Sequence, residues 1–131
     1  MDNFQIVKLI GKGTFGRVYK CIDPKNNKTY AVKRISVLKQ SKEDNTGNLY
    51  ELHILYHNTC PFILKYFSCE FKTYELSIVT KFCKYGDLYR NIQIRLKKFN
   101  YFEEKEIWKI FLQLTYGIYY LHKNNIIHRD L

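Results

Sequence analysis

The chain has 131 residues, of which 46% are hydrophobic and 17% aromatic; this excludes an intrinsically disordered chain and allows one domain with its own core. No stretch approaches the roughly 18 consecutive apolar residues of a membrane span, so we expect no membrane partner. The formal net charge of +10 allows an acidic partner, but the lysines are scattered along the whole chain, so nucleic-acid binding is a minority hypothesis.

The first third of the chain is predicted to form three strands. Residues 4–10 alternate loosely between apolar and polar, a glycine-rich segment follows, and residues 17–23 run back as a second strand. Pro24 and the asparagines after it are a strong turn signal, because proline presets one backbone dihedral and asparagine tolerates left-handed geometry. The third strand is then expected over residues 29–35.

A helix and a hairpin come next. Residues 36–48 are polar and without a clear period, which predicts a loop, and leucines at helical spacing predict a helix over residues 48–57. Two short apolar strands over residues 64–71 and 75–82 are expected to form a hairpin. The first part of the chain is therefore predicted to be a five-stranded antiparallel sheet with one helix.

Beyond Gly86 the pattern changes to helices. Asp87 is expected to cap a helix that runs to about Lys97, and a second helix is expected to begin at Asn100 or Glu103. The second helix carries one apolar stripe, formed by Ile107, Ile110, Phe111, Leu114, Ile118 and Leu121. Because a stripe this continuous must be buried against something, we predict a partner or a chaperone on the helix of residues 102–123. The fold class is α+β.

The chain gives little sign of secretion or of metal binding. It opens with Met1-Asp2-Asn3 and not with a basic and then apolar leader, which predicts a cytoplasmic or nuclear location. The four cysteines show no C-x-x-C spacing, so we expect reduced thiols. His53 and His57 have the spacing of a metal pair, but no glutamate stands between them as in H-E-x-x-H, and we assign no metal ligand.

Three short motifs carry the chemistry. Gly11-Lys12-Gly13-Thr14-Phe15-Gly16 is a G-x-G-x-x-G segment, which dinucleotide-binding folds also use, but there the third glycine opens a helix and here a strand follows. Ala31-Val32-Lys33 comes next, and His128-Arg129-Asp130-Leu131 is the last segment. In this order the three motifs resemble the protein kinase family.

The resemblance implies a site for ATP. The glycine hairpin would lie over the phosphates, Lys33 would pair with the α- and β-phosphates, and a carboxylate on the following helix would pair with Lys33. Glu51 is the only acidic residue within the predicted helix, so the resemblance assigns it that role. Asp130 would accept the proton of the substrate hydroxyl, which makes Asp130, Lys33 and Glu51 the candidate catalytic residues.

The resemblance also implies an adenine pocket. Thr80 would be the gatekeeper at its back, and the main chain of Lys81 and Cys83 would bond to the ring. The whole candidate set for the cofactor comprises Ile10, Gly11, Gly13, Gly16, Val18, Ala31, Lys33, Thr80, Lys81, Cys83 and Leu88. The hinge and the segment after it are most similar to NIMA-related serine/threonine kinases.

The resemblance divides the chain into residues 1–84, a kinase small lobe, and residues 85–131, the beginning of an incomplete helical large lobe. In the family, the residues that hold Mg²⁺ come after the position of Leu131, and so do those that bind the protein substrate. We therefore expect ATP as cofactor, no metal ligand in this chain and no useful phosphoryl transfer by the polypeptide as it stands. The alternative is a non-catalytic, pseudokinase-like module that binds nucleotide or a partner kinase.

Overall fold

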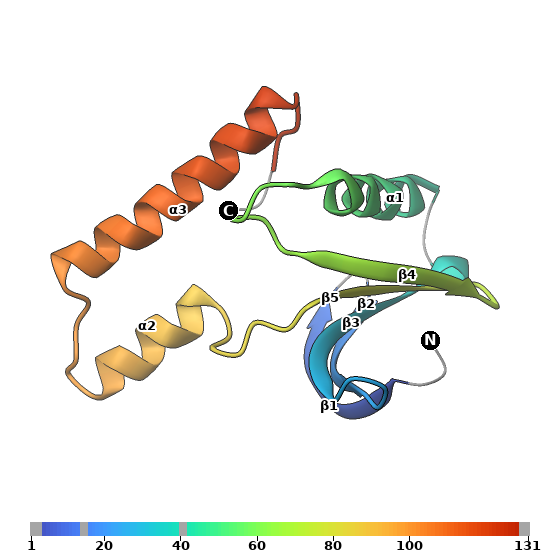
Figure 1. Ribbon diagram of the computed structural model, residues 1–131, viewed down its shortest axis with the longest axis horizontal. Helices are drawn as coiled ribbons and strands as arrows, with labels where there is room; N and C mark the ends of the chain where they lie inside the picture. Colours follow the sequence, from blue (N-terminus) through green and yellow to red (C-terminus); the bar gives the residue numbers. More distant parts are fainter. Residues whose placement is uncertain (1–3, 14–15, 40–41, 129–131) are drawn as a thin grey trace. The chain divides into compact units, whose positions relative to one another are not determined.

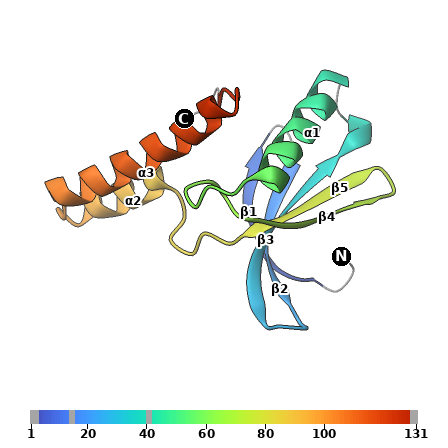
Figure 2. The same ribbon diagram turned by 45° about the horizontal axis from the view of Figure 1, so that its top comes forward.

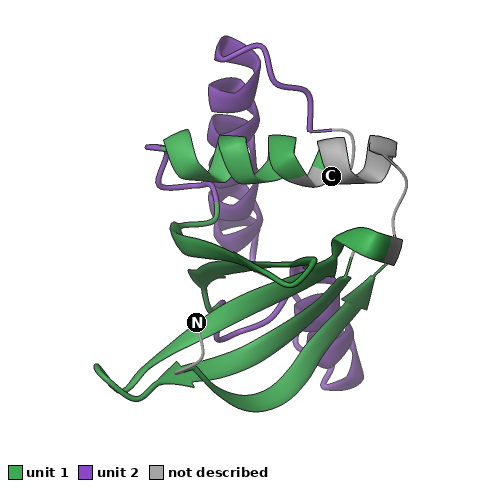
Figure 3. Ribbon diagram, turned by 90° about the vertical axis from the view of Figure 1, so that its right-hand side faces the viewer, with its two compact units in different colours: residues 1–58, 64–82 green, residues 59–63, 83–131 purple. Residues whose placement is uncertain are grey.

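The computed structural model describes residues 4–13, 16–39 and 42–128, and it separates into two compact units (Figure 3). The first unit takes its described residues from 1–58 and 64–82, and the second from 59–63 and 83–131. The short segment 59–63 thus groups with the later part of the chain. The division into lobes at residue 84 stays a prediction.

The first unit is built on one antiparallel sheet (Figure 1). Its strands are β1 (Gln5–Gly13), β2 (Gly16–Asp23), β3 (Lys28–Ser36), β4 (Tyr66–Lys72) and β5 (Glu75–Lys81). Their order across the sheet is β1-β2-β3-β5-β4, so β1 and β4 are the edges and β3 is central. The predicted five-stranded antiparallel sheet is confirmed.

Local hydrogen bonds explain both tight turns of the sheet. Between β2 and β3 the Asp23 carboxylate accepts a bond from the Lys25 N–H at 2.9 Å, and Asn27 takes a left-handed φ of 54°. Between β4 and β5 the chain turns through Thr73 and Tyr74, with φ of 42° and 67°. Two successive positive φ angles suit a two-residue hairpin but strain residues that carry side chains.

One helix packs on the sheet (Figure 2). It is α1 (Lys42–His57), and the short 3-10 helix η1 (Val37–Lys39) joins it to β3. The Val37 N–H donates to the Tyr74 carbonyl at 2.8 Å, which ties this connection to the β4–β5 turn. Leu52 and Leu55 of α1 pack against a buried cluster of Ile35, Leu76 and Ile78.

The predicted loop over residues 36–48 is wrong, because α1 begins at Lys42. The first two turns of α1 are polar, so apolar periodicity reveals only the second half of the helix, where Leu52 and Leu55 pack on the sheet. The longer helix also contains Glu43 and Asp44, and Glu51 is therefore not its only acidic residue.

The opposite face of the sheet has its own buried cluster, formed by Cys21, Val32 and Val79. Phe4, Tyr19 and Tyr30 pack against this cluster. Burial raises the pKa of the Cys21 thiol, and the charge of Arg34 partly opposes the shift. Both faces of the central strands are therefore apolar, which is what the near-continuous apolar runs of β3 and β5 require.

The second unit contains α2 (Leu88–Lys97) and α3 (Glu104–Lys123). Asp87 caps α2 as predicted, with its Oδ1 accepting from the Arg90 N–H at 2.6 Å. Glu103, one of the two predicted starts, precedes α3. No helix among the described residues is long and apolar enough to cross a membrane.

Segment 59–63 is held by α3 within the second unit. The Thr59 N–H donates to the Tyr120 hydroxyl at 3.3 Å, and the Phe62 ring stacks on Tyr116 with centroids 5.8 Å apart. Gly117 of α3 is buried beside Phe62. These contacts join residues about sixty positions apart in the sequence, and no periodic pattern in the sequence predicts them.

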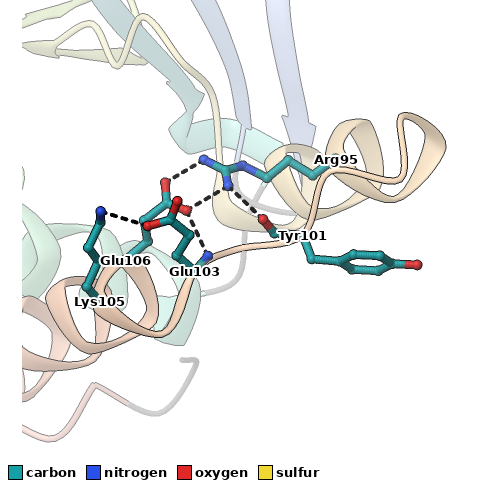
Figure 4. A network of polar contacts seen from close by, with 5 residues as sticks. All are labelled: Arg95, Tyr101, Glu103, Lys105 and Glu106. Carbon is teal, nitrogen blue, oxygen red and sulfur yellow. Dashed lines mark hydrogen bonds and ion pairs between the residues drawn. The ribbon is translucent and has the colours of Figure 1, made fainter.

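The corner between α2 and α3 is closed by Arg95 and Glu106 (Figure 4). The guanidinium donates two bonds to the carboxylate, at 2.9 and 2.7 Å, and it lies 3.9 Å from the centre of the Phe102 ring. The same carboxylate accepts from the Glu103 N–H at 2.9 Å. The bond from Arg95, helped by the Glu103 backbone, lowers the pKa of Glu106 to about 2.

We expect Glu106→Gln to remove one source of acid sensitivity from the second unit. A carboxylate whose pKa is lowered in the folded state stabilises the fold at pH values above its unfolded pKa of about 4.3, and this contribution is lost as the pH falls toward 2. Urea unfolding of the chain at pH 5 and at pH 2.5 measures the difference. Glu104→Gln is the matched control, and equal pH slopes for both variants and the unmodified chain would contradict the role of the corner.

Candidate functional site

The glycine-rich segment closes the hairpin between β1 and β2. Gly13 pairs with Gly16, and Gly11 pairs with Val18. Gly16 has a φ of 151°, and a Cβ at this position would lie only 2.3 Å from the carbonyl oxygen of Arg34. A Cβ on Gly13 would meet no described atom within 4 Å. The fold of the sheet therefore requires glycine at position 16, whereas the described packing does not require it at position 13.

Lys33 and Glu51 meet in the first unit. Lys33 lies on β3, directly opposite Val18 of β2 and Ile78 of β5, and its Nζ is 2.6 Å from the Oε2 of Glu51 on α1. The Lys33 side chain is 23% exposed and that of Glu51 is 44% exposed. The structure thus places a cation, held by a carboxylate, on the face of the sheet that α1 covers. Its role with a nucleotide stays a prediction.

Three more candidate residues share that face. Ala31 lies two positions before Lys33 and is paired with Thr80 of β5, and both are buried. Val18 projects to the same side because it is paired with Lys33. Ile10 lies at an irregularity of β1 between two paired positions and is 42% exposed. The sheet register therefore gathers Val18, Ala31, Lys33 and Thr80.

Lys20 belongs to this face and sequence reasoning missed it. It is paired with Ala31, and its Nζ lies 5.3 Å from the centre of the Phe82 ring. Because side chains alternate along a strand, Lys20, two positions after Val18 on β2, could have been assigned to the same face as Val18 from the sequence.

The main chain near the end of β5 limits the predicted adenine contacts. The Lys81 N–H already donates to the Lys65 carbonyl at 2.8 Å, so only the carbonyl of Lys81 is left for a bound ring. The Cys83 carbonyl accepts from the Gly86 N–H at 3.2 Å, and its own N–H bonds to no described residue. Cys83 and Leu88 belong to the second unit, and Asp130 lies outside the described residues.

The geometry defines a class of protein. A five-stranded sheet with a glycine hairpin, a lysine on its third strand and a helix glutamate bonded to that lysine forms a kinase small lobe. The family model described as protein kinase domain matches residues 4–131. The chain belongs to the protein kinase family, and its fold matches a kinase small lobe followed by the start of a large lobe.

Individual relatives of this chain include serine/threonine kinases. Serine/threonine-protein kinase dst4 of Dictyostelium discoideum is 36% identical over 98% of this chain, and serine/threonine-protein kinase Nek5 of Mus musculus is 35% identical over all of it. Wee1-like protein kinase 2 of Homo sapiens is 31% identical over 98% of the chain. The resemblance to NIMA-related kinases is confirmed by the Nek match, although similarity extends beyond that branch.

The chain is much shorter than these relatives. It spans 25% of the length of dst4, 20% of Nek5 and 23% of Wee1-like protein kinase 2. The similarity therefore identifies part of a kinase domain, and the activity and substrates of a whole protein belong to the proposals below.

The two glycines give a sharp test of the hairpin. We expect Gly16→Ala to lower the free energy of unfolding by about 2 kcal/mol or more, because both the positive φ and the Arg34 carbonyl oppose a Cβ. Gly13→Ala is the matched control, with an expected change of less than about 0.5 kcal/mol. Urea unfolding of the two variants measures both. Equal destabilisation by the two substitutions would contradict the special requirement for glycine at position 16.

Proposed function

We propose that the chain carries the ATP-binding part of a serine/threonine protein kinase. The observation that supports this most strongly is the Lys33–Glu51 ion pair, because it holds an ammonium group at a fixed place beside the glycine hairpin. An ammonium group in that place would neutralise the α- and β-phosphates of ATP. The proposed location is the cytoplasm or the nucleus.

We assign roles to the other candidate residues from their positions relative to the Lys33–Glu51 pair. The open space beside Gly13 would let the hairpin backbone approach a phosphate. Val18, Ala31 and Thr80 would surround the adenine, with Ile10 at the edge and Leu88 on the other side. The Lys81 carbonyl would accept from the ring, and the Cys83 N–H would donate to it.

Phosphoryl transfer requires more than the binding of ATP. Asp130 would orient the hydroxyl of a serine or threonine in a protein substrate and take its proton. Mg²⁺ would arrive with ATP and shield the phosphate charge. Among the described residues no group of three or more His, Cys, Asp or Glu could hold a metal ion.

Substitution of Lys33 tests ATP binding. We expect Lys33→Ala to weaken the binding of Mg²⁺–ATP at least about tenfold in a calorimetric titration, since a charged hydrogen-bond donor to phosphate is lost. The unfolding free energy should change by less than about 1 kcal/mol, because the pair is partly exposed. Lys28→Ala, on the same strand, is the control and should bind normally. Equal affinities for all three chains would refute the proposed site.

A second test concerns activity. We predict that the 131-residue polypeptide does not phosphorylate a generic protein substrate with Mg²⁺ and labelled ATP, whereas it still binds ATP. Mg²⁺-dependent transfer that Asp130→Asn abolishes would overturn the predicted inactivity and assign the catalytic role to Asp130 in one experiment.

A non-catalytic interaction module is the second candidate. It is favoured by α3, where Ile107, Phe111 and Leu114 are each at least half exposed. A partner protein or a chaperone that covers this face fits such a role. Binding of ATP without transfer is common to both candidates, so a partner that requires the α3 face would separate them.

A further inference from the structure

A row of three cations crosses the first unit's sheet. Lys12 of β1 is directly opposite Arg17 of β2, and Arg17 is directly opposite Arg34 of β3. Paired residues project to the same side, and adjacent strands are about 4.8 Å apart, so the three positions span roughly 10 Å. Like charges that face each other across strands destabilise a sheet. The arrangement therefore has a cost in stability that the fold does not explain.

The row lies on the face of the sheet opposite to α1. Side chains alternate along a strand, and Lys33, the neighbour of Arg34, bonds to Glu51 of α1. Arg34 therefore projects to the other side, where it lies over the ring of Tyr19 at 5.6 Å. Within the first unit, no described helix packs on this side (Figure 2).

Only Arg34 of the row is near an acidic group among the described residues, and that ion pair is long. The Nε of Arg34 is 3.7 Å from Glu75, too far for a hydrogen bond, and this nitrogen is closed to solvent without a bond to any described residue. Glu70 is paired with Lys72 at 3.2 Å. Lys12 and Arg17 form no ion pair with the described residues. This contrasts with the corner in the second unit, where a carboxylate satisfies the arginine with two bonds.

We propose that this cation row, Lys12, Arg17 and Arg34, binds a phosphorylated segment of a partner protein. A phosphoryl group carries nearly two negative charges and three acceptor oxygens, and two guanidinium groups on adjacent strands match it with paired hydrogen bonds. Its arrival would also relieve the repulsion within the row.

Neighbouring residues favour a peptide over a nucleic acid. Ile6 and Leu9 of β1 are paired with Cys21 and Tyr19, so they project to the same side as Lys12, and each is nearly half exposed. β1 is also an edge strand, whose free backbone groups can bond to an extended peptide. A short row of charge beside apolar side chains suits one phosphoryl group and its flanking residues, whereas a nucleic acid needs an extended basic stripe.

The cation row is separate from the proposed ATP site. Val18 and Lys33 project to the α1 side, whereas Arg17 and Arg34, their neighbours in the chain, project away from it. We therefore expect a phosphopeptide and ATP to bind without competition. A failure of the ATP site would leave this binding unchanged, so the two proposals can fail independently.

Fluorescence anisotropy tests the proposal. The probe is a labelled peptide with one phosphoserine among leucine and glutamate residues, and its unphosphorylated form is the reference. We expect the phosphopeptide to bind the 131-residue chain at least about tenfold more tightly than the reference, and inorganic phosphate at millimolar concentration to compete. Binding should weaken with salt and should persist in saturating Mg²⁺–ATP.

Two double variants locate the site. Lys12→Gln with Arg17→Gln should reduce phosphopeptide affinity at least about tenfold. Lys25→Gln with Lys28→Gln, which removes the same charge from the β2–β3 end of the sheet, should leave it within about twofold. Circular dichroism of each variant checks that the chain folds. Arg17→Lys alone should lose less affinity than the double variant, because it keeps the charge and loses only the paired hydrogen bonds. Equal losses in the two double variants, displacement by ATP, or tighter binding of duplex RNA than of the phosphopeptide would each overturn the proposal.

Discussion

The register of β3 with its two neighbours is the constraint on which the rest of the first unit depends. Because β3 is central, its pairing with β2 and β5 fixes which side chains appear on each face. The same alternation puts Lys33 against Glu51 on the side of α1 and Arg34 beside Arg17 on the other side. A slip of one residue would exchange the two faces, remove the lysine from its carboxylate and bury a guanidinium under the helix. The buried side chains Val32 and Ile35, one on each face, oppose that slip.

Much of this architecture could be predicted from the sequence, and the parts that could not share a physical cause. Short apolar runs bounded by strong turn residues revealed the five strands, and a single aspartate revealed the start of α2. The first turns of α1 gave no signal, because their sequence is polar and has no apolar period. The meeting of Lys33 and Glu51 was implied by family resemblance, and the roles of these and the other candidate residues with ATP remain predictions. Contacts such as Thr59 with Tyr120 depend on tertiary packing alone, which no local pattern records.

The structure shows two kinds of positively charged residue in this chain. At the corner of the second unit Arg95 is bonded to Glu106 and stacked on Phe102, so its charge stabilises a local fold. In the first unit Lys12 and Arg17 form no ion pair with described residues and are brought together only by strand register. The composition of the chain cannot distinguish these two kinds of residue, because it counts all lysines and arginines alike. The distinction between a cation that is neutralised and one that is not requires the sheet.

The turn between β4 and β5 has a consequence for the helix that carries Glu51. Thr73 and Tyr74 both adopt left-handed backbone angles there, and the Tyr74 carbonyl accepts the bond from Val37 at the start of the connection to α1. The hairpin conformation and the beginning of the helix connection are thus coupled mechanically, although Thr73 and Tyr74 are far from Lys33 in the sequence. Relaxation of the turn would break the bond between the Val37 N–H and the Tyr74 carbonyl, which holds the start of the connection from β3. The distance between the lysine and its carboxylate would then depend on a loop at the far end of a different strand pair.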